Sequence, residues 1–170
     1  MRRDESARRL IGAGCIVAFL IFKFLHVIGA VVLLGTGAGI AFFMLMAHRT
    51  GDAAFIAGTA STVVVADAVF TLTAIIVQPV TGYLLMHEAE FSFSETWIWG
   101  SLLLYFVAGA FWVPVVWMQV RMRDLAAAAA KSDGKLPDAY RRLFRIWFLF
   151  GFPGFGAVLA IVWLMIAKPT

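Results

Sequence analysis

Charged side chains are scarce in this chain of 170 residues. Asp and Glu together number 10, Lys and Arg number 14, and charged residues make up 14% of the sequence, whereas a soluble domain carries about 25%. Hydrophobic residues make up 62% of the chain. Because so few charged groups cannot cover so much apolar surface, the composition excludes an ordinary soluble globular protein and predicts an integral membrane protein.

Cysteine and the common catalytic motifs are also scarce or absent. A single cysteine, Cys15, excludes an internal disulfide and a cluster of thiolate metal ligands, and we expect it to be a small packing residue rather than a lipid anchor. The sequence contains no P-loop, no dinucleotide fingerprint, no nucleophile elbow and no HExxH zinc motif. It therefore predicts no catalytic residue and leaves open whether the protein is an enzyme.

Four long apolar segments lie between the charged stretches. They run approximately over residues 10–47, 54–86, 97–120 and 146–167, and each is long enough to cross the hydrocarbon, which takes about 20 helical residues. Open sheets cannot cross, because their edge groups would lack partners in lipid. The sequence predicts an all-α transmembrane four-helix bundle that forms one membrane domain over residues 1–170.

The connections between these segments differ in charge, and the difference predicts the topology. The connection at 121–145 is basic, and its alanine run at 126–130 favours a continuation of the third helix into water. The connection HEAEFSFSE has no lysine or arginine. Because basic connections stay in the cytoplasm and face anionic lipid, we expect both termini outside a bacterial-type inner membrane and no nucleic-acid partner. Four residues argue for the opposite orientation: Arg2, Arg3, Arg8 and Arg9.

Two ionisable side chains, Lys23 and His26, lie close together in the first apolar segment. Lys23 is expected at the outer interface, where its stem reaches the headgroups. His26 lies one turn deeper, where an imidazole needs a partner. Three roles are open for it: a hydrogen bond that joins helices, axial ligation of haem iron, or a place in a copper or proton path. Small residues on the same helix face favour a flat group packed there: Gly29, Ala30 and Gly37.

The second apolar segment contains Asp67 and Gln78. A carboxyl at this depth either pairs with a cation or is neutral, and we expect pairing. The candidate cations are Arg121, Arg123 and Arg145. Gln78 precedes Pro79, which removes a backbone donor, and the Gln78 amide either satisfies a carbonyl freed by the proline or bridges two helices. Pro114 and Pro153 interrupt the last two segments, and such kinks open space for a porphyrin or a quinone.

The stretch KFLHVIGAVVLLGTGAGIAFF, which begins at Lys23, resembles the first helix of the CopD and HemJ-like membrane proteins. In that helix a K-x-x-H motif is followed by small and apolar residues. From Lys23 onward, the chain more closely resembles a family of predicted four-span integral membrane proteins of unknown function. The matching pieces are KFLHVIGA, VADAVFTLTAIIVQPVTG, WIWGSLLLYFVAGAFWVPVVWMQVRMRDL, YRRLFRIWFLFGFPGFGA and WLMIAKP.

The CopD and HemJ-like resemblance implies haem b, with His26 as an axial ligand of the iron and Lys23 as the partner of a haem propionate. His87, at the outer end of the second segment, is then the leading candidate for a second ligand. His48 lies 22 residues beyond His26, which is about 33 Å along a helix, so it cannot reach the same iron.

We therefore expect a small b-type haem protein of the inner membrane that transfers electrons or takes part in haem- or porphyrin-linked redox chemistry. Its partners would be the lipid bilayer and a quinone or redox protein. The first alternative is a non-enzymatic accessory or assembly subunit of a larger membrane complex, or a homo-oligomer. The second alternative is copper or proton transport that uses Lys23, His26 and Asp67.

Overall fold

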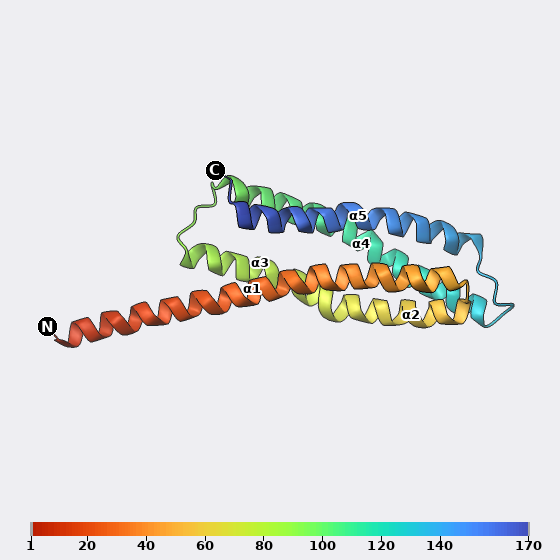
Figure 1. The fold of residues 1–170 in the computed structure, drawn as a ribbon, viewed down its shortest axis with the longest axis horizontal. Helices are drawn as coiled ribbons and strands as arrows, with labels where there is room; N and C mark the ends of the chain where they lie inside the picture. The colour runs from red at the N-terminus through yellow and green to blue at the C-terminus, as the bar shows by residue number, and fades with distance from the viewer. Residues whose placement is uncertain (1, 170) are drawn as a thin grey trace.

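The computed structural model describes the backbone of residues 2–169 and the side chains of residues 16–169. This part of the chain is helical and contains no strand, which confirms the all-α class. The elements are α1 (Arg2–Thr50), α2 (Ala53–Ala66), the π-helical turn η1 (Asp67–Thr71), α3 (Leu72–Glu88), α4 (Thr96–Ala130) and α5 (Asp138–Ala167), as Figure 1 shows. The side chains of Cys15 and of the four N-terminal arginines lie outside the described residues.

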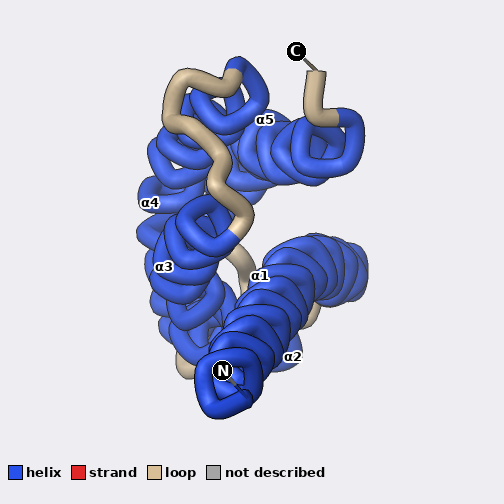
Figure 2. The backbone as a smooth tube through the Cα atoms, turned by 90° about the vertical axis from the view of Figure 1, so that its left-hand side faces the viewer, coloured by secondary structure: helices blue, strands red, loops and turns tan. Residues whose placement is uncertain are grey.

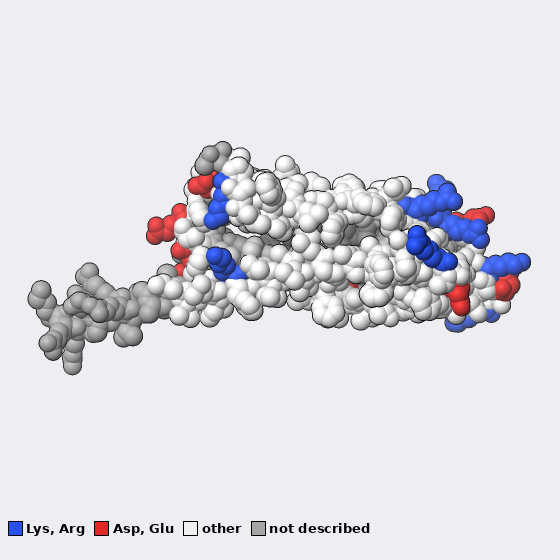
Figure 3. Space-filling view, in the orientation of Figure 1, with Lys and Arg blue, Asp and Glu red and all other residues white. Residues whose placement is uncertain are grey.

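Four helical segments are long and apolar enough to cross a membrane, as predicted. They are Ile16–Thr50, Ala53–Glu88, Thr96–Ala130 and Asp138–Ala167. The second joins α2, η1 and α3 without a break. Apart from Asp67, which lies within the second span, the described charged side chains gather at the two ends of the bundle, and uncharged side chains cover the band between them (Figure 3).

A tight turn joins α1 to α2, because the sequence RTGD supplies both a flexible residue and a helix cap. Gly51 has a φ of 68°, a conformation that glycine adopts without strain. An Asp52 carboxylate oxygen accepts hydrogen bonds from the backbone N–H groups of Ala54 and Phe55, at 2.8 and 3.1 Å. This is the usual way to satisfy the free N–H groups at a helix start.

The basic connection predicted at 121–145 is largely helical. The alanine run belongs to α4, which ends at Ala130, as the sequence favoured. The turn at 131–137 contains Gly134, whose φ is 75°, and ends at Pro137. α4 therefore continues past the third apolar segment, and α5 begins before the fourth.

The helices form two layers. α4 packs along α5 in one layer, and α1 packs along α3 in the other, while α2 bridges the layers by contacting α4 as well as α1. Each layer has one helix on each side of the bundle. In Figure 2, which is viewed along the bundle, α3 and α4 lie on one side, and α1 and α5 lie on the other. The space-filling view shows a hollow along the boundary between α5 and α1 (Figure 3).

The main buried core lies in the half of the bundle where α1 ends and α5 begins. It joins side chains of α1, α2, α4 and α5 in one cluster: Ile40, Met44, Ala47, Ile56, Ala60, Val63, Met118, Met122, Ala126, Tyr140, Phe144 and Trp147. Large apolar side chains are instead exposed on the outside, as Phe106 and Ile166 illustrate at 70% and 73%. An apolar exterior of this kind is suited to contact with lipid.

Candidate functional site

His26 is held between α1 and α3 by a side-chain hydrogen bond. Its Nδ1 lies 2.9 Å from Oγ1 of Thr81. That hydroxyl has its own acceptors in the preceding turn, the carbonyl oxygens of Val77 at 2.9 Å and Gln78 at 3.2 Å. Since a hydroxyl carries a single hydrogen, Thr81 is assigned as the acceptor from His26 Nδ1–H. The neutral imidazole then keeps the lone pair on Nε2.

Gln78 adds a second bond across the same helix pair. Its Nε2 donates to the backbone carbonyl of His26 at 2.9 Å, so the helix-bridging role expected for Gln78 is confirmed. Small residues permit the close approach: a Cβ built at Gly29 would lie 2.7 Å from the Gln78 amide nitrogen, and one at Gly82 would lie 3.3 Å from the His26 ring. The hydrogen-bonding role that was open for His26 is therefore present.

The small-residue face of α1 is filled by protein rather than left open for a flat group. The Gln78 side chain occupies the space at Gly29, and the Phe155 ring of α5 lies 3.6 Å from a Cβ built at Gly37. Helix contacts thus account for the small residues that the sequence assigned to packing against a flat ligand. Small residues serve the same purpose in many membrane helix pairs.

The structure does not bring His87 to His26. His87 lies in the last turn of α3, and its side chain is exposed. It is six residues beyond Thr81, which places it about 9 Å further along the helix and about 120° around it. Lys23 is also exposed, one turn from His26, and its ammonium nitrogen lies 5.8 Å from the centre of the Phe19 ring.

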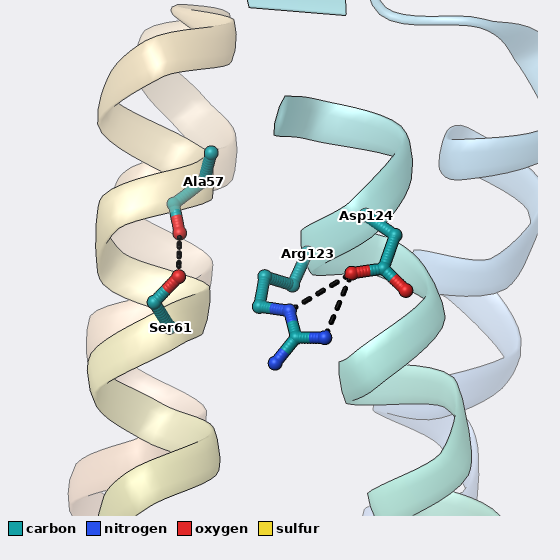
Figure 4. A network of polar contacts seen from close by, with 4 residues as sticks. All are labelled: Ala57, Ser61, Arg123 and Asp124. Carbon is teal, nitrogen blue, oxygen red and sulfur yellow. Dashed lines mark hydrogen bonds and ion pairs between the residues drawn. The ribbon is translucent and has the colours of Figure 1, made fainter. Parts of the chain in front are cut away.

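Asp67 is buried within the second span, where it begins the π-helical turn η1. Its residue is 4% exposed, and its carboxylate has no hydrogen-bond or ion-pair partner in the described part of the chain. The expected pairing with an arginine is absent: Arg123 instead binds its neighbour Asp124 at 2.8 Å (Figure 4). The π-turn was not predicted, because no residue type marks an N–H to C=O bond that spans five residues, here from Leu72 to Asp67.

The buried face of the second span is polar from its centre toward the end of α3. Asp67, Thr71, Gln78 and Thr81 are each at most 9% exposed. Thr81 bonds back to its own helix, but the hydroxyl of Thr71 is buried without a partner among the described residues. Because polar groups in a membrane are costly unless satisfied, Asp67 and Thr71 form the least satisfied part of this face.

A second group of buried polar atoms lies at the other end of α1. The His48 ring stacks on Phe144, with centroids 3.7 Å apart and planes 11° apart, and lies 5.8 Å from the Tyr140 ring. The His48 Nδ1, the Tyr140 hydroxyl, the Trp147 Nε1 and the Gln119 Oε1 are buried with no hydrogen-bond partner in the described chain. Aromatic packing rather than hydrogen bonding holds this end together.

Metal-ligating side chains are not gathered anywhere in the part of the chain that the structure describes. No group of three or more His, Cys, Asp or Glu residues is placed to hold a metal ion there. His26 and His48 lie in different halves of the apolar span Ile16–Thr50. A metal bound at His26 would therefore have to bring most of its own ligands, as haem does.

The remaining evidence comes from comparison with known sequences. A family model described as predicted integral membrane protein (DUF2269) matches residues 20–169. The chain belongs to this DUF2269 family. The match confirms the closer of the two resemblances, and it makes the protein a predicted integral membrane protein with four helices able to span the bilayer.

Neither the curated proteins nor the solved structures provide a match to this DUF2269 chain. The similarity to CopD and HemJ-like proteins receives no support from these comparisons and stays a prediction carried by Lys23–Phe43. The DUF2269 description states where the protein resides and assigns it no activity.

Proposed function

We propose that the protein is a small b-type haem protein with His26 as the axial ligand. The observation that carries the proposal is the hydrogen bond of His26 Nδ1 to Thr81 Oγ1, 2.9 Å long. A metal-ligating histidine usually donates its other ring N–H to a neighbouring acceptor, which fixes the tautomer and makes the ligating nitrogen more basic. The residues at His26 fit this requirement, because Nε2 keeps its lone pair and the ring is held by Thr81 and Gly82.

Bound haem would supply one-electron redox chemistry. The chain's own residues hold the imidazole, and Lys23, exposed one turn away, offers a cation for a propionate. The proposal rests on His26 alone, since His87 lies on another face of α3. A quinone or a redox protein would exchange the electrons. In the proposed topology the basic end faces the cytoplasm of a bacterial-type cell and both termini lie outside.

Absorption spectra of the detergent-purified protein, before and after dithionite reduction, test the proposal. We expect a Soret band with reduced α and β bands that His26→Ala abolishes and His48→Ala retains. Thr81→Val should keep the haem and shift its reduction potential, because the variant removes the acceptor for Nδ1–H. A wild type that stays colourless after haem reconstitution would overturn the proposal and leave the accessory-subunit role, in which His26 only joins α1 to α3.

A second candidate function is proton binding at Asp67, within the bilayer. The observation in its favour is that Asp67 is 4% exposed and has no partner among the described residues, next to the unpartnered Thr71 hydroxyl. A carboxyl inside the bilayer is by default a candidate functional site. The helices that contact η1 bring no other charged residue into this stretch: α2 has none, α1 has none between His26 and His48, and α3 has none before His87.

Labelling with dicyclohexylcarbodiimide, which reacts with protonated carboxyls in apolar surroundings, tests this second function. Peptide mass spectrometry should place the adduct on Asp67, and Asp67→Asn should remove it. Protection by sodium ions at constant pH would show that the ligand is a cation instead. Absence of an adduct at every pH would overturn the proton site.

A further inference from the structure

A cleft at the basic end of the bundle lies between α4 and the start of α5. Its volume is about 940 Å³. The side chains that define its character are Trp117, Arg121, Arg141, Arg142, Arg145 and Ile146. They come from two helices that are separated in sequence by the turn at 131–137, so the cleft exists only because α4 and α5 pack side by side (Figure 1).

The charge in this cleft is unbalanced. None of its four arginines makes a hydrogen bond or an ion pair with another described residue, and Asp138 is the one acidic side chain that lines it. Four guanidinium groups against one carboxylate leave three positive charges. Arg123 provides a contrast on the same helix, because it is bound to Asp124 and does not line the cleft. Figure 3 shows the blue side chains that gather at this end of the molecule.

The start of α5 contributes to the same site. Asp138 and Ala139 line the cleft and are the first two residues of a 30-residue helix. Pro137, at the cap position, offers no side chain to accept their N–H groups. The first N–H groups of a helix are unpaired and attract anions, phosphate in particular. The cleft thus combines guanidinium groups with a helix N-terminus, and both favour a negatively charged ligand.

Apolar side chains line the rest of the cleft. Leu125 and Leu143 lie beside Ile146, and Trp117 is 62% exposed. Trp117 and Ile146 also stand where the basic end of the bundle meets the apolar band. An aromatic ring at such a boundary is typical of the level of lipid headgroups. A ligand suited to this lining has an anionic head and a hydrocarbon tail.

We propose that this cleft binds an anionic phospholipid, with the phosphate among the arginines and the first acyl carbons against Trp117 and Ile146. Guanidinium groups bind phosphate oxygens in pairs of parallel hydrogen bonds, and basic pockets between membrane helices are suited to anionic headgroups. The proposal is independent of haem binding, because the cleft lies at the opposite end of the bundle from His26.

Binding of phosphatidylglycerol to the full-length protein in neutral detergent tests the proposal by native mass spectrometry and by thermal unfolding. We expect the protein to retain phosphatidylglycerol in preference to phosphatidylcholine and to melt at a higher temperature when phosphatidylglycerol is added. The double variant Arg142→Gln/Arg145→Gln should bind phosphatidylglycerol with an affinity at least about tenfold lower than that of the wild type. Both residues are exposed, so the substitutions leave the core unchanged.

Arg123→Gln is the matched control, since it removes a positive charge from the same end of the bundle without touching the cleft. If the control loses as much binding as the double variant, the loss reflects general surface charge, and the proposed lipid site is wrong. Equal retention of phosphatidylcholine would overturn it as well. If inorganic phosphate alone raises the melting temperature as much as the lipid does, the cleft is a phosphate site and the lipid assignment fails.

Discussion

Two of the contacts of α1 are made by different means, as its two histidines illustrate. In the half of the bundle where α3 ends, His26 meets α3 through a hydrogen bond to Thr81, and Gln78 adds a bond to the His26 carbonyl. In the half where α5 begins, His48 meets α5 by stacking on Phe144, and its Nδ1 has no partner among the described residues. The His26 contact depends on hydrogen-bonding groups that face each other, and the His48 contact depends on the fit of apolar surfaces.

This difference bears on what each region can do. The polar contact fixes the orientation of an imidazole and leaves one ring nitrogen with its lone pair, which suits ligation. The stacked contact fills space with flexible and aromatic side chains such as Met44 and Tyr140, which suits stability. We therefore expect substitutions in the His26 contact to be sensitive to the loss of single polar atoms, and those in the His48 contact to be sensitive to side-chain volume.

Gly29→Leu should produce the largest effect. A side chain at this position displaces the Gln78 amide, since even a Cβ would lie 2.7 Å from it. The amide then loses its hydrogen bond to the His26 carbonyl, and a buried donor left without a partner costs about 1–3 kcal/mol. Unfolding by SDS in mixed micelles measures the loss. Gly35→Leu is the matched control on the same helix, because nothing lies within 4 Å of a Cβ at Gly35. Equal losses in the two variants would mean that α1 and α3 do not meet closely.

Removal of one hydroxyl from each region should separate the two kinds of contact. Thr81→Val takes away the acceptor for His26 and should cost about 1 kcal/mol of unfolding free energy. Tyr140→Phe removes a buried hydroxyl that has no partner in the described chain, so stability should be unchanged or slightly increased. Equilibrium unfolding of both variants in the same detergent gives the comparison, and the reverse order would contradict it.

Lys168→Met should destabilise the protein less than Gly29→Leu or Thr81→Val. The Lys168 ammonium lies 4.5 Å from the centre of the Phe91 ring and 5.4 Å from that of Trp97, so it ties the end of α5 to the start of α4. Because the lysine is exposed, its cation–π contact is worth about 0.5 kcal/mol, at the low end of such contacts. Thermal unfolding should detect a slight decrease, whereas Lys135→Met, in the exposed turn, should leave the melting temperature unchanged. A decrease as large as that of Thr81→Val would contradict this small contribution of the Lys168 contact.

Composition and hydropathy were enough to predict the helical class and the four apolar helices, because the need to satisfy every backbone group in lipid leaves few alternatives. Gln78 could also be identified, since a lone amide in an apolar segment must find a partner. The charge pattern could not show that most of the connection at 121–145 is helical, because charged residues are compatible with helix ends in water as well as with loops.

The sequence alone could not predict which side chains pair between helices. Nothing in the sequence around Thr81 marks it as a partner of His26, because the contact depends on how α3 packs against α1. Asp67 was expected to find an arginine, but Arg123 has a nearer carboxylate at the next residue. The arginines of the cleft are individually typical of a cytoplasmic helix end. Their meeting in one concave site depends on the packing of α4 against α5.

The π-helical turn at Asp67–Thr71 also has a consequence for relatives of different length. Its hydrogen bond from Leu72 to Asp67 spans one residue more than an α-helical bond. A relative that lacks one residue here would have a continuous α-helix, and its residues on either side would be rotated by about 100° relative to each other. Gln78 and Thr81 could then face α1 only if Ile56 and Ala60 turned away from the main buried core. A one-residue gap at this place in an alignment would therefore mark a rearranged bundle rather than a tolerated loop deletion.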